Sequence, residues 1–469
     1  MSVRIILRAL GILALFASVV LSASVSAAPP AQAPDPEQNA EPIGAQALTS
    51  AGPFRVMDIN PGAASSMTAI QFADLGGIAY FAASNGVNGY ELWKSDGTMR
   101  GTVMVRDIWP GSTSSSPAYL TVVGNALYFV AGYSGIGREL WKSDGTAAGT
   151  TLIANIDGGA TDSSVLNLTA VGTTLYFRAN DGVHGEELWK STATGTSLVK
   201  DIRLGSASSS PTSLIKVGSL LYFTAYDDLG ICGLWKSNGT GAGTVLVKSF
   251  SLGCPSRLTA VGSAVYFHAT DGPQGVNGGH GVELWKSNGA AAGTVMVKDI
   301  SPTGSSYPYS LVRMGALLYF GAQDGQSLGL WKSNGTGAGT VLVRRFNDGP
   351  DLPTAVGSLL YFNANDGSGW GLWKSNGTLA GTSKVRNFVD STYFPTVIGA
   401  VLYFMTSDGV TGYEVWRSDG TPAGTYPLGD IQPGNNSMSW PNGLSRVGTR
   451  LFFVDTDTTS GYEPWIYFP

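Results

Sequence analysis

Side chains with the chemistry of catalysis or metal binding are few in this chain, and their spacing matches no established site. The three histidines, His184, His268 and His280, show none of the short spacings, such as His-x-x-x-His, that place two ligands on one metal. There is no Gly-x-Ser-x-Gly segment leading into a helix and no Gly-rich phosphate loop. The sequence therefore nominates no catalytic residue and no cofactor.

Carboxylates recur in pairs across glycine-containing loops. Asp181 and Glu187 lie six residues apart, as do Asp408 and Glu414. Two carboxylates with loop carbonyls could bind Ca²⁺, which prefers oxygen ligands. The alternative, that the glutamate accepts hydrogen bonds from the loop's own amides, is favoured because several copies of the motif have Gly in place of Glu. We claim no metal site, and no carboxylate pair stands out as a glycosidase dyad.

These residues belong to a repeat that runs through most of the chain. The segment Glu-Leu-Trp-Lys-Ser-Asp-Gly-Thr at 139–146 recurs in variant form, with its tryptophans 42 to 50 residues apart. Before each tryptophan, a Gly is followed four residues later by Tyr-Phe or Phe-Phe. A period of this length is typical of a solenoid, propeller or array. The repeated tryptophans, which we interpret as structural, are Trp93, Trp141, Trp189, Trp235, Trp285, Trp331, Trp373, Trp416 and Trp465.

One unit, residues 211–250, shows what is repeated. Four short runs rich in β-branched and aromatic residues (213–217, 220–225, 234–236 and 245–247) are separated by turn signals such as Asn238-Gly239. No window shows helical periodicity. The run Leu-Tyr-Phe needs cover on both faces, which four-stranded antiparallel sheets stacked around an axis provide. We therefore predict an all-β propeller of nine blades, with an eight-bladed ring and one displaced copy as the alternative.

The Asx-Gly pair after Trp-Lys-Ser predicts a turn. Asp occupies the first position at 96, 144 and 419, whereas Asn occupies it at 238, 288, 334 and 376. A general acid or a tight calcium ligand needs the carboxylate, but a turn acceptor tolerates either side chain. The interchange therefore favours a structural role.

The sequence resembles the bacterial ELWxxDGT repeat family from about residue 53 to the end. Glu-Leu-Trp begins at 91, 139, 187 and 283, and weaker versions begin at 233, 329, 371, 414 and 463. The resemblance implies a secreted or surface repeat protein, with a propeller as the expected fold. It implies no established reaction.

Three segments are expected. Residues 1–28 read as a signal peptide, with Arg4 and Arg8 before an apolar core and an Ala-x-Ala-like end at Val25-Ser26-Ala27. The apolar core is too short to span a bilayer, so we expect no membrane insertion of the mature chain. Residues 29–52 form a disordered tether rich in Pro and Ala. Residues 53–469 form a single repeat domain, because no linker interrupts the array. We expect a secreted, periplasmic or cell-surface location.

Composition limits the partners. Charged residues make up 13% of the chain, against about 25% in typical domains. The formal net charge of −5 would become −7 without Arg4 and Arg8. A mildly acidic chain without a Lys/Arg cluster is a poor binder of nucleic acid. We expect a monomer.

Two further predictions concern closure of the ring and a disulfide. The final repeat stops at 465–468 without a fourth strand, whereas Phe54 to Ile59 matches the fourth-strand run Val103 to Ile108. The N-terminal strand should therefore complete the last blade and remove two free edges. Cys232 and Cys254 lie at the same end of neighbouring antiparallel strands, so in an exported protein we expect them to form a disulfide.

The functional face is expected at the end of the ring that carries the variable loops. The aromatic residues that lie outside the repeat pattern fall there, and we predict them as the ligand-binding residues: Trp109, Trp370, Trp440, Tyr307 and Tyr393. The alternative is that each packs under its own loop. We expect a binding or adhesion module for a glycan or protein ligand. An extracellular carbohydrate-active hydrolase or lyase and a structural envelope protein are the alternatives.

Overall fold

The computed structural model describes residues 52–67, 71–276, 278–432 and 440–469. The chain separates into two units, Met1–Thr49 and Ser50–Pro469, and all described residues lie in the second. The expected signal peptide at 1–28 and the tether at 29–52 thus lie outside the described residues, apart from Gly52.

The second unit is built from nine four-stranded antiparallel sheets, the blades, each following the last along the chain. The first three are β2 (Ala73–Leu75), β3 (Ile78–Ser84), β4 (Tyr90–Ser95) and β5 (Val103–Arg106); β6 (Ala118–Val123), β7 (Ala126–Tyr133), β8 (Gly137–Ser143) and β9 (Thr151–Ala154); and β10 (Leu166–Val171), β11 (Thr174–Asn180), β12 (Glu186–Thr192) and β13 (Gly195–Lys200).

The next three blades are β14 (Thr212–Val217), β15 (Leu220–Tyr226), β16 (Cys232–Ser237) and β17 (Val245–Phe250); β18 (Ser256–Val261), β19 (Ala264–Thr270), β20 (Val282–Ser287) and β21 (Val295–Lys298); and β22 (Tyr309–Met314), β23 (Leu317–Gln323), β24 (Leu328–Ser333) and β25 (Val341–Phe346). A short 3-10 turn, η1 (Ala291–Gly293), precedes β21.

The last three blades are β26 (Asp348–Val356), β27 (Leu359–Asn365), β28 (Trp370–Ser375) and β29 (Thr382–Asn387); β30 (Tyr393–Ile398), β31 (Val401–Ser407), β32 (Tyr413–Ser418) and β33 (Tyr426–Pro427); and β34 (Asn442–Val447), β35 (Arg450–Asp455) and β36 (Glu463–Tyr467), completed by β1 (Phe54–Arg55).

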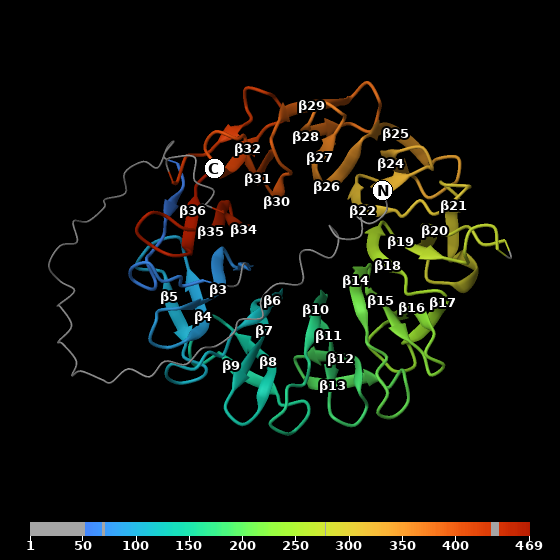
Figure 1. The fold of residues 1–469 in the computed structure, drawn as a ribbon. Helices are drawn as coiled ribbons and strands as arrows, with labels where there is room; N and C mark the ends of the chain where they lie inside the picture. The colour runs from blue at the N-terminus through green and yellow to red at the C-terminus, as the bar shows by residue number, and fades with distance from the viewer. Residues whose placement is uncertain (1–51, 68–70, 277, 433–439) are drawn as a thin grey trace, which may run out of the picture. The chain divides into compact units, whose positions relative to one another are not determined.

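The blades stand in a ring, with the first strand of each nearest the centre (Figure 1). A segment of variable length, the crossing, then leads from the outermost strand of one blade to the innermost strand of the next. All nine repeats form blades, so the propeller prediction is confirmed and the eight-bladed alternative is wrong.

The ring closes as the sequence predicts. Strand β1 pairs with β36, with Phe54 opposite Ile466 and Arg55 opposite Trp465. The Phe54 and Phe468 rings stack at 5.9 Å. The Arg55 guanidinium bonds the Asp457 carboxylate at 2.9 Å. The N-terminal strand thus supplies the fourth strand that the final repeat lacks.

Aromatic side chains fill the interfaces between neighbouring blades. Between the third and fourth blades, Tyr176 lies in one buried cluster with Phe223 and Trp235. The equivalent residues form the same kind of cluster at other interfaces, for example Tyr319 with Phe362 and Trp373. This packing explains why Tyr-Phe and Trp recur at fixed positions, since each blade must cover the next.

The Asx-Gly turns hold their own hairpins and also tie neighbouring blades together. Asp144 Oδ1 accepts bonds from the backbone and the hydroxyl of Thr146 at 2.9 and 2.8 Å. Asn238 serves Thr240 in the same way, so the predicted turn role is confirmed. Lys94 Nζ in the first blade donates to the Gly145 carbonyl in the second at 2.9 Å. The same inter-blade bond recurs at Lys190–Gly239, Lys332–Gly377 and Lys374–Gly420.

Glycine is required in these turns for two reasons. Gly145 has φ +90°, a conformation that other residues rarely adopt. A Cβ atom at this position would also lie 2.1 Å from the Tyr80 hydroxyl of the preceding blade. The turn and the interface therefore impose the same residue.

Candidate ligand-binding face

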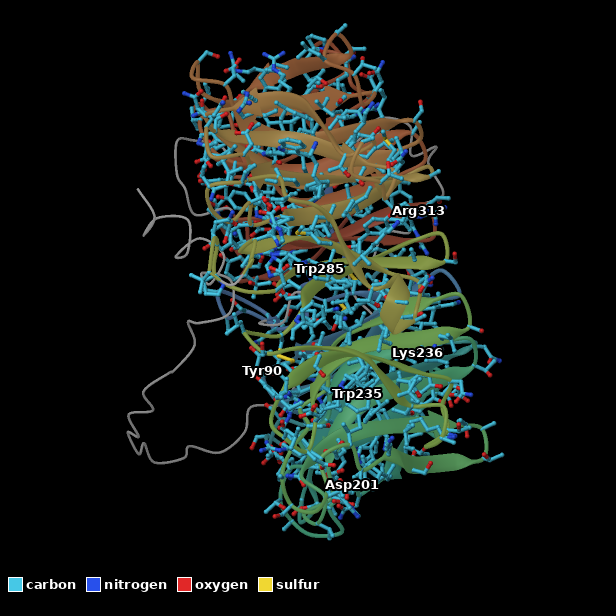
Figure 2. The ribbon with its side chains drawn as sticks, turned by 90° about the vertical axis from the view of Figure 1, so that its right-hand side faces the viewer. Tyr90, Asp201, Trp235, Lys236, Trp285 and Arg313 are labelled. Atoms are coloured by element: carbon cyan, nitrogen blue, oxygen red, sulfur yellow. A yellow bond between two sulfur atoms is a disulfide. The ribbon has the colours of Figure 1, made fainter. Side chains whose placement is uncertain are left out.

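The two ends of the ring carry different kinds of loop. In the first eight blades, the turns after the first and third strands share one end, the turn end, and the ninth blade has the first of these turns there. The loops after the second strand share the other end, the crossing end, with the crossings. Figure 2 shows the ring from its side, with Lys236 and Arg313 towards the turn end and Tyr90 towards the crossing end. By their positions in the chain, Trp109, Trp370, Trp440, Tyr307 and Tyr393 belong to the crossing end.

The glutamates of the Glu-Leu-Trp motif anchor the crossings. Glu91 is fully buried and accepts bonds from the Ile108 amide at 2.8 Å, and from the Ser115 amide and hydroxyl at 2.9 and 2.6 Å. Glu139, Glu187, Glu283 and Glu463 bind their crossings in the same way. The interpretation of Glu as a hydrogen-bond acceptor is confirmed, but its donors lie in the crossing and not in the loop before it.

Burial and hydrogen bonding act in opposite directions on these carboxyl groups. Loss of hydration raises the pKa of Glu283 to about 7, although bonds from Ser306 and Ile300 partly offset the rise. Burial raises the pKa of Glu414 further, to about 9, because its bond from the Ile431 amide is long, at 3.4 Å, and Asp455 and Asp430 lie nearby.

Three blades replace this anchor with an aromatic residue. Where the motif has Gly233, Gly329 or Gly371 in place of Glu, the fourth strand ends at or is followed by a buried phenylalanine in place of isoleucine. Phe250 packs edge-on against Trp285 at 5.4 Å, and Phe346 and Phe388 contact Trp373 and Trp416 at 5.1 Å. A crossing is thus held either by a buried carboxylate or by an aromatic contact.

Asp181 and Glu187, one of the carboxylate pairs considered for Ca²⁺, bond different parts of the chain. Glu187 bonds the crossing at Ile202 and Ser209. Asp181 accepts the amides of Val183 and His184 and contacts the His184 ring at 2.7 Å. Within the residues described, no group of three or more His, Cys, Asp or Glu side chains is placed to hold a metal.

The histidines have contrasting environments. Bonds to Asp181 and Asp271 raise the pKa of His184 and of His280, both at the crossing end. His268 lies between Ser256 and the Pro308 carbonyl, at 2.5 and 3.1 Å, and burial lowers its pKa. Each of the three side chains is therefore held by a different part of the ring.

Two of the predicted ligand-binding aromatics come together. Trp440 lies 5.9 Å from Tyr393 and 4.3 Å from Tyr413, measured between ring centroids. The Tyr413 hydroxyl bonds the Asp390 carboxylate, and burial together with this bond raises the pKa of Tyr413. These four residues, termed the Trp440 cluster, lie at the crossing end around the eighth blade and the crossing to the ninth.

The other three predicted aromatics lie apart from this cluster. Trp109 is partly buried against Gly132, where a Cβ atom would be 3.4 Å from its ring. Trp370 begins β28 and is partly buried, whereas Tyr307 is 56% exposed in its crossing. Across the part of the chain that the structure describes, none of the three makes a ring contact with the Trp440 cluster.

One pair of positions varies from blade to blade while the framework repeats. The residue after the Tyr-Phe or Phe-Phe pair lies opposite a residue at or near the start of the innermost strand, so the two side chains share one face of the sheet. In eight of the blades the pairs are Ala118/Val130, Leu166/Arg178, Thr212/Thr224, Ser256/His268, Tyr309/Gly321, Asp351/Asn363, Tyr393/Met405 and Asn442/Val454.

A cavity of about 250 Å³ opens beside the smallest of these pairs, Ala118/Val130, between the second and third blades. We term it the inter-blade cavity. It lies at the crossing end, and its lining residues are Ala118, Tyr119, Val130, Arg138, Asp162, Ser164, Val165, Leu166 and Glu186.

Polar groups of the cavity are held by the surrounding backbone and by each other. Arg138 donates to the Ser115 and Ser116 carbonyls at 3.4 and 2.9 Å, and its own amide bonds Asp162 Oδ1 at 2.8 Å. Glu186 Oε2 accepts the Ser210 hydroxyl at 3.1 Å and lies 3.5 Å from the Arg178 guanidinium. The charged groups therefore have fixed positions before any ligand arrives.

Tyr119 is presented to the cavity by an unusual backbone conformation. It has φ +57° at a bulge in β6, and 46% of its surface is exposed. The corresponding residues of other blades, such as Arg257 and Leu352, have φ +58° and +48°. Bulges re-aim side chains, and this one recurs in the ring with a residue type that varies between blades.

None of the cavity residues was among the predicted ligand-binding residues. Their signal in the sequence is weak, because it consists of two small residues together, Ala118 and Val130, where each of the other paired copies has a larger residue in at least one of the two positions. Trp109 alone adjoins the cavity, since Gly132, on which it packs, pairs directly with Arg138.

The structure also bears on the compartment. Cys232 and Cys254 form the predicted disulfide, and the described residues include no free cysteine. Disulfides persist in oxidising, extracytoplasmic surroundings. In the described part of the chain, no helix is both long and apolar enough to cross a membrane.

No protein-family profile matches the chain, and no curated protein matches it in sequence. Among solved structures, the computationally designed Ika8 protein is similar over 76% of this chain and 97% of its own, with 15% identity and a TM-score of 0.44. A puromycin hydrolase is similar over 72% of this chain, with 14% identity and a TM-score of 0.39, and this chain spans 58% of its length. The β-propeller domain of the Trilobed protease from Pyrococcus furiosus is similar over 68% of this chain and 99% of its own, with 12% identity and a TM-score of 0.36. No functional conclusion for this chain follows at these values.

Proposed function

We propose that this chain is an exported binding module that holds a glycan at the crossing end of its propeller. The observation that carries the proposal is the Trp440 cluster, in which two non-repeated aromatic rings and Tyr413 meet beside the Asp390 carboxylate. Aromatic faces stack on the C–H faces of sugar rings, and carboxylates accept bonds from sugar hydroxyls. The turn end is built largely from repeated turns in which Asp or Asn side chains bond their own loops.

Export and family membership are part of the same proposal. The disulfide supports an oxidising compartment, and the apolar segment with its Ala-x-Ala-like end supports removal of residues 1–28. The recurring Glu-Leu-Trp segments, which begin third strands or lie within them, support membership of the bacterial ELWxxDGT repeat family.

The test is a glycan-array screen of residues 29–469, followed by affinity measurements on any hit. We expect alanine at Trp440 to weaken binding tenfold or more and to leave thermal stability nearly intact. Alanine at Trp370 or Trp109, which lie apart from the cluster, should weaken the binding only of glycans long enough to reach them. Asn334→Asp at the turn end is the matched control, because either residue serves as the turn acceptor. Unchanged affinity in all three tryptophan variants, or an equal loss in the control, would contradict the proposal.

A hydrolase is the second candidate, and one observation favours it. Asp162 and Glu186 line the same cavity, and glycoside hydrolysis is commonly performed by two carboxylates that flank one bond. Turnover assays on every glycan that binds separate the candidates, since a binding module releases its ligand unchanged. Turnover that is lost in both Asp162→Asn and Glu186→Gln at saturating glycan would establish the hydrolase at this cavity. A structural envelope protein, or a module for a protein ligand, predicts an array without hits.

A further inference from the structure

We propose that the inter-blade cavity is a subsite for a single neutral sugar residue in its pyranose form. This inference rests on the proposed glycan-binding function and adds a site and a ligand class to it. The cavity lies between the second and third blades, whereas the Trp440 cluster lies around the eighth.

The size of the cavity limits its occupant. Its volume of about 250 Å³ is below the roughly 300–1,000 Å³ of pockets that take drug-sized molecules. One hexopyranose ring is a group of suitable size, and a longer chain would have to extend out of the mouth. The ring of Tyr119, 46% exposed, lies at the wall with the apolar side chains of Val130, Val165 and Leu166. These groups suit the C–H face of a sugar ring.

The polar wall suits hydroxyl groups. Asp162 uses Oδ1 and Glu186 uses Oε2 in bonds to the protein. For the residues that the structure describes, neither Asp162 Oδ2 nor Glu186 Oε1 has a hydrogen-bond partner, so each remains an acceptor. A carboxylate cannot donate, and a ligand must therefore bring O–H or N–H donors. The hydroxyls of a pyranose are such donors, and different hydroxyls could bond Asp162 and Glu186.

The charge balance favours a neutral ligand. Two carboxylates, Asp162 and Glu186, are matched by two guanidinium groups, Arg138 in the wall and Arg178 against Glu186. Arg138 bonds the Ser115 and Ser116 carbonyls, and Arg178 lies against the Glu186 carboxylate. Both guanidinium groups are therefore already engaged by the protein and do not form an anion site. A phosphate or an ammonium group would meet like charge as well as opposite charge.

The experiment is an NMR titration of residues 29–469 with the methyl pyranosides of glucose, galactose and mannose. Glucose 6-phosphate and glucosamine serve as charged probes. We expect saturable binding of at least one methyl pyranoside, and binding of the charged analogues at least tenfold weaker. Tyr119→Asn and Asp162→Asn should each weaken binding tenfold or more. Asn tolerates the left-handed conformation of residue 119, so the loss reports the ring and not the backbone.

The matched control is Leu352→Asn, which changes the exposed bulge residue of the seventh blade and should leave pyranoside affinity unchanged. Tyr119→Phe keeps the ring and should change affinity less than threefold. Absence of pyranoside binding, or unchanged affinity in Tyr119→Asn and Asp162→Asn, overturns the subsite. If larger glycans still bind through the Trp440 cluster in that case, the proposed function stands. A third outcome is that Asp162→Asn abolishes pyranoside binding while the tryptophan variants bind glycans on the array as the parent does. This outcome supports the subsite and refutes the Trp440 cluster as the glycan-binding site.

Discussion

The buried glutamates of the Glu-Leu-Trp motif show how a single residue can secure a long connection. Each carboxylate gathers donors from both ends of its crossing, as Glu283 does with Ile300 and Ser306. A buried backbone amide left without an acceptor is costly, so these contacts allow an irregular crossing to lie over the ring. Replacement by Gly in three blades is accompanied by a phenylalanine that holds the crossing through packing.

The raised pKa of Glu283 predicts that stability depends on pH in a defined window. Between pH 4.5 and about 7, the folded chain retains a proton that the unfolded chain has lost. The stabilisation is therefore complete below pH 4.5 and is lost as the pH rises through 7. The free energy of unfolding should fall by up to about 3 kcal/mol from this group.

Denaturant unfolding at half-unit steps from pH 4.5 to 7.5 measures this slope. Glu283→Gln cannot titrate and should show a shallower slope than the parent. Asp228→Asn changes an exposed carboxylate and should keep the parental slope. Parallel curves for the parent and Glu283→Gln would refute the pKa assignment.

The role of these glutamates was only partly predictable. Glycine in place of glutamate already indicated that the carboxylate is not an essential ligand. The donors could not be placed, because Ile108 and Ser115 follow Glu91 by 17 and 24 residues and only the folded crossing brings them back. A usable signal was present, since Glu accompanies Ile and Ser in the crossing whereas Gly accompanies Phe.

At the scale of elements, strands followed from local signals. The run Leu220 to Ala225 became β15 (Leu220–Tyr226), because β-branched and aromatic residues between two turn signals favour a strand. The bulges in the innermost strands were not predicted. Ser213 has φ +54°, and no property of a serine marks that conformation in a sequence.

The disulfide belongs to one blade and predicts a local gain in stability. It joins the first residue of β16 to the crossing after β17, and the two cysteines are 22 positions apart in the chain. In the chain-entropy account, a loop of this size stabilises the fold by about 3 kcal/mol. Replacement of Cys232 and Cys254 by serine should lower the free energy of unfolding by about that amount.

Chemical unfolding with and without reductant tests the assignment. The reductant should destabilise the parent to the level of the double variant and should leave that variant unchanged. Equal stability of parent and variant under oxidising conditions would show that the bridge contributes nothing. Two free thiols in the native protein would show that it does not form.

For the whole molecule, ring closure is the decisive contact. Beyond the β1–β36 pair, Val56 and Ile59 are almost fully buried in the cluster between the last and first blades. Burying one such side chain contributes roughly 1.5–3 kcal/mol. Deletion of residues 53–60 should therefore destabilise the ring by at least about 3 kcal/mol.

Calorimetry of the truncated chain measures the effect, and deletion of residues 29–51 is the control because it spares every one of these contacts. We expect the control to melt like the parent and the longer deletion to melt well below it. A longer deletion with parental melting would mean that the ring closes without its N-terminal strand.

Blade number and closure were predictable because they follow from counting repeats and from matching Phe54–Ile59 to Val103–Ile108. The inter-blade cavity was not, because it arises from missing volume. Ala118 and Val130 are unremarkable residues in a sequence, and only the geometry of two adjoining sheets shows that nothing else fills the space between them. The role of Tyr119 was not predictable either, because its exposure depends on a backbone bulge that the sequence does not mark.

The strand that closes the ring is also the part of the described fold that meets residues 1–51 of the chain. A force applied through residues 1–51 acts first on β1. This strand is held to β36 by two residue pairs and to Asp457 by the Arg55 guanidinium. Peeling this strand away would free the edge of the ninth blade and loosen its junction with the first. If the N-terminal segment were anchored and force were applied through a bound ligand, the force would act first on the pairing of β1 with β36. The same contact that makes the ring stable at rest would set the force at which it yields.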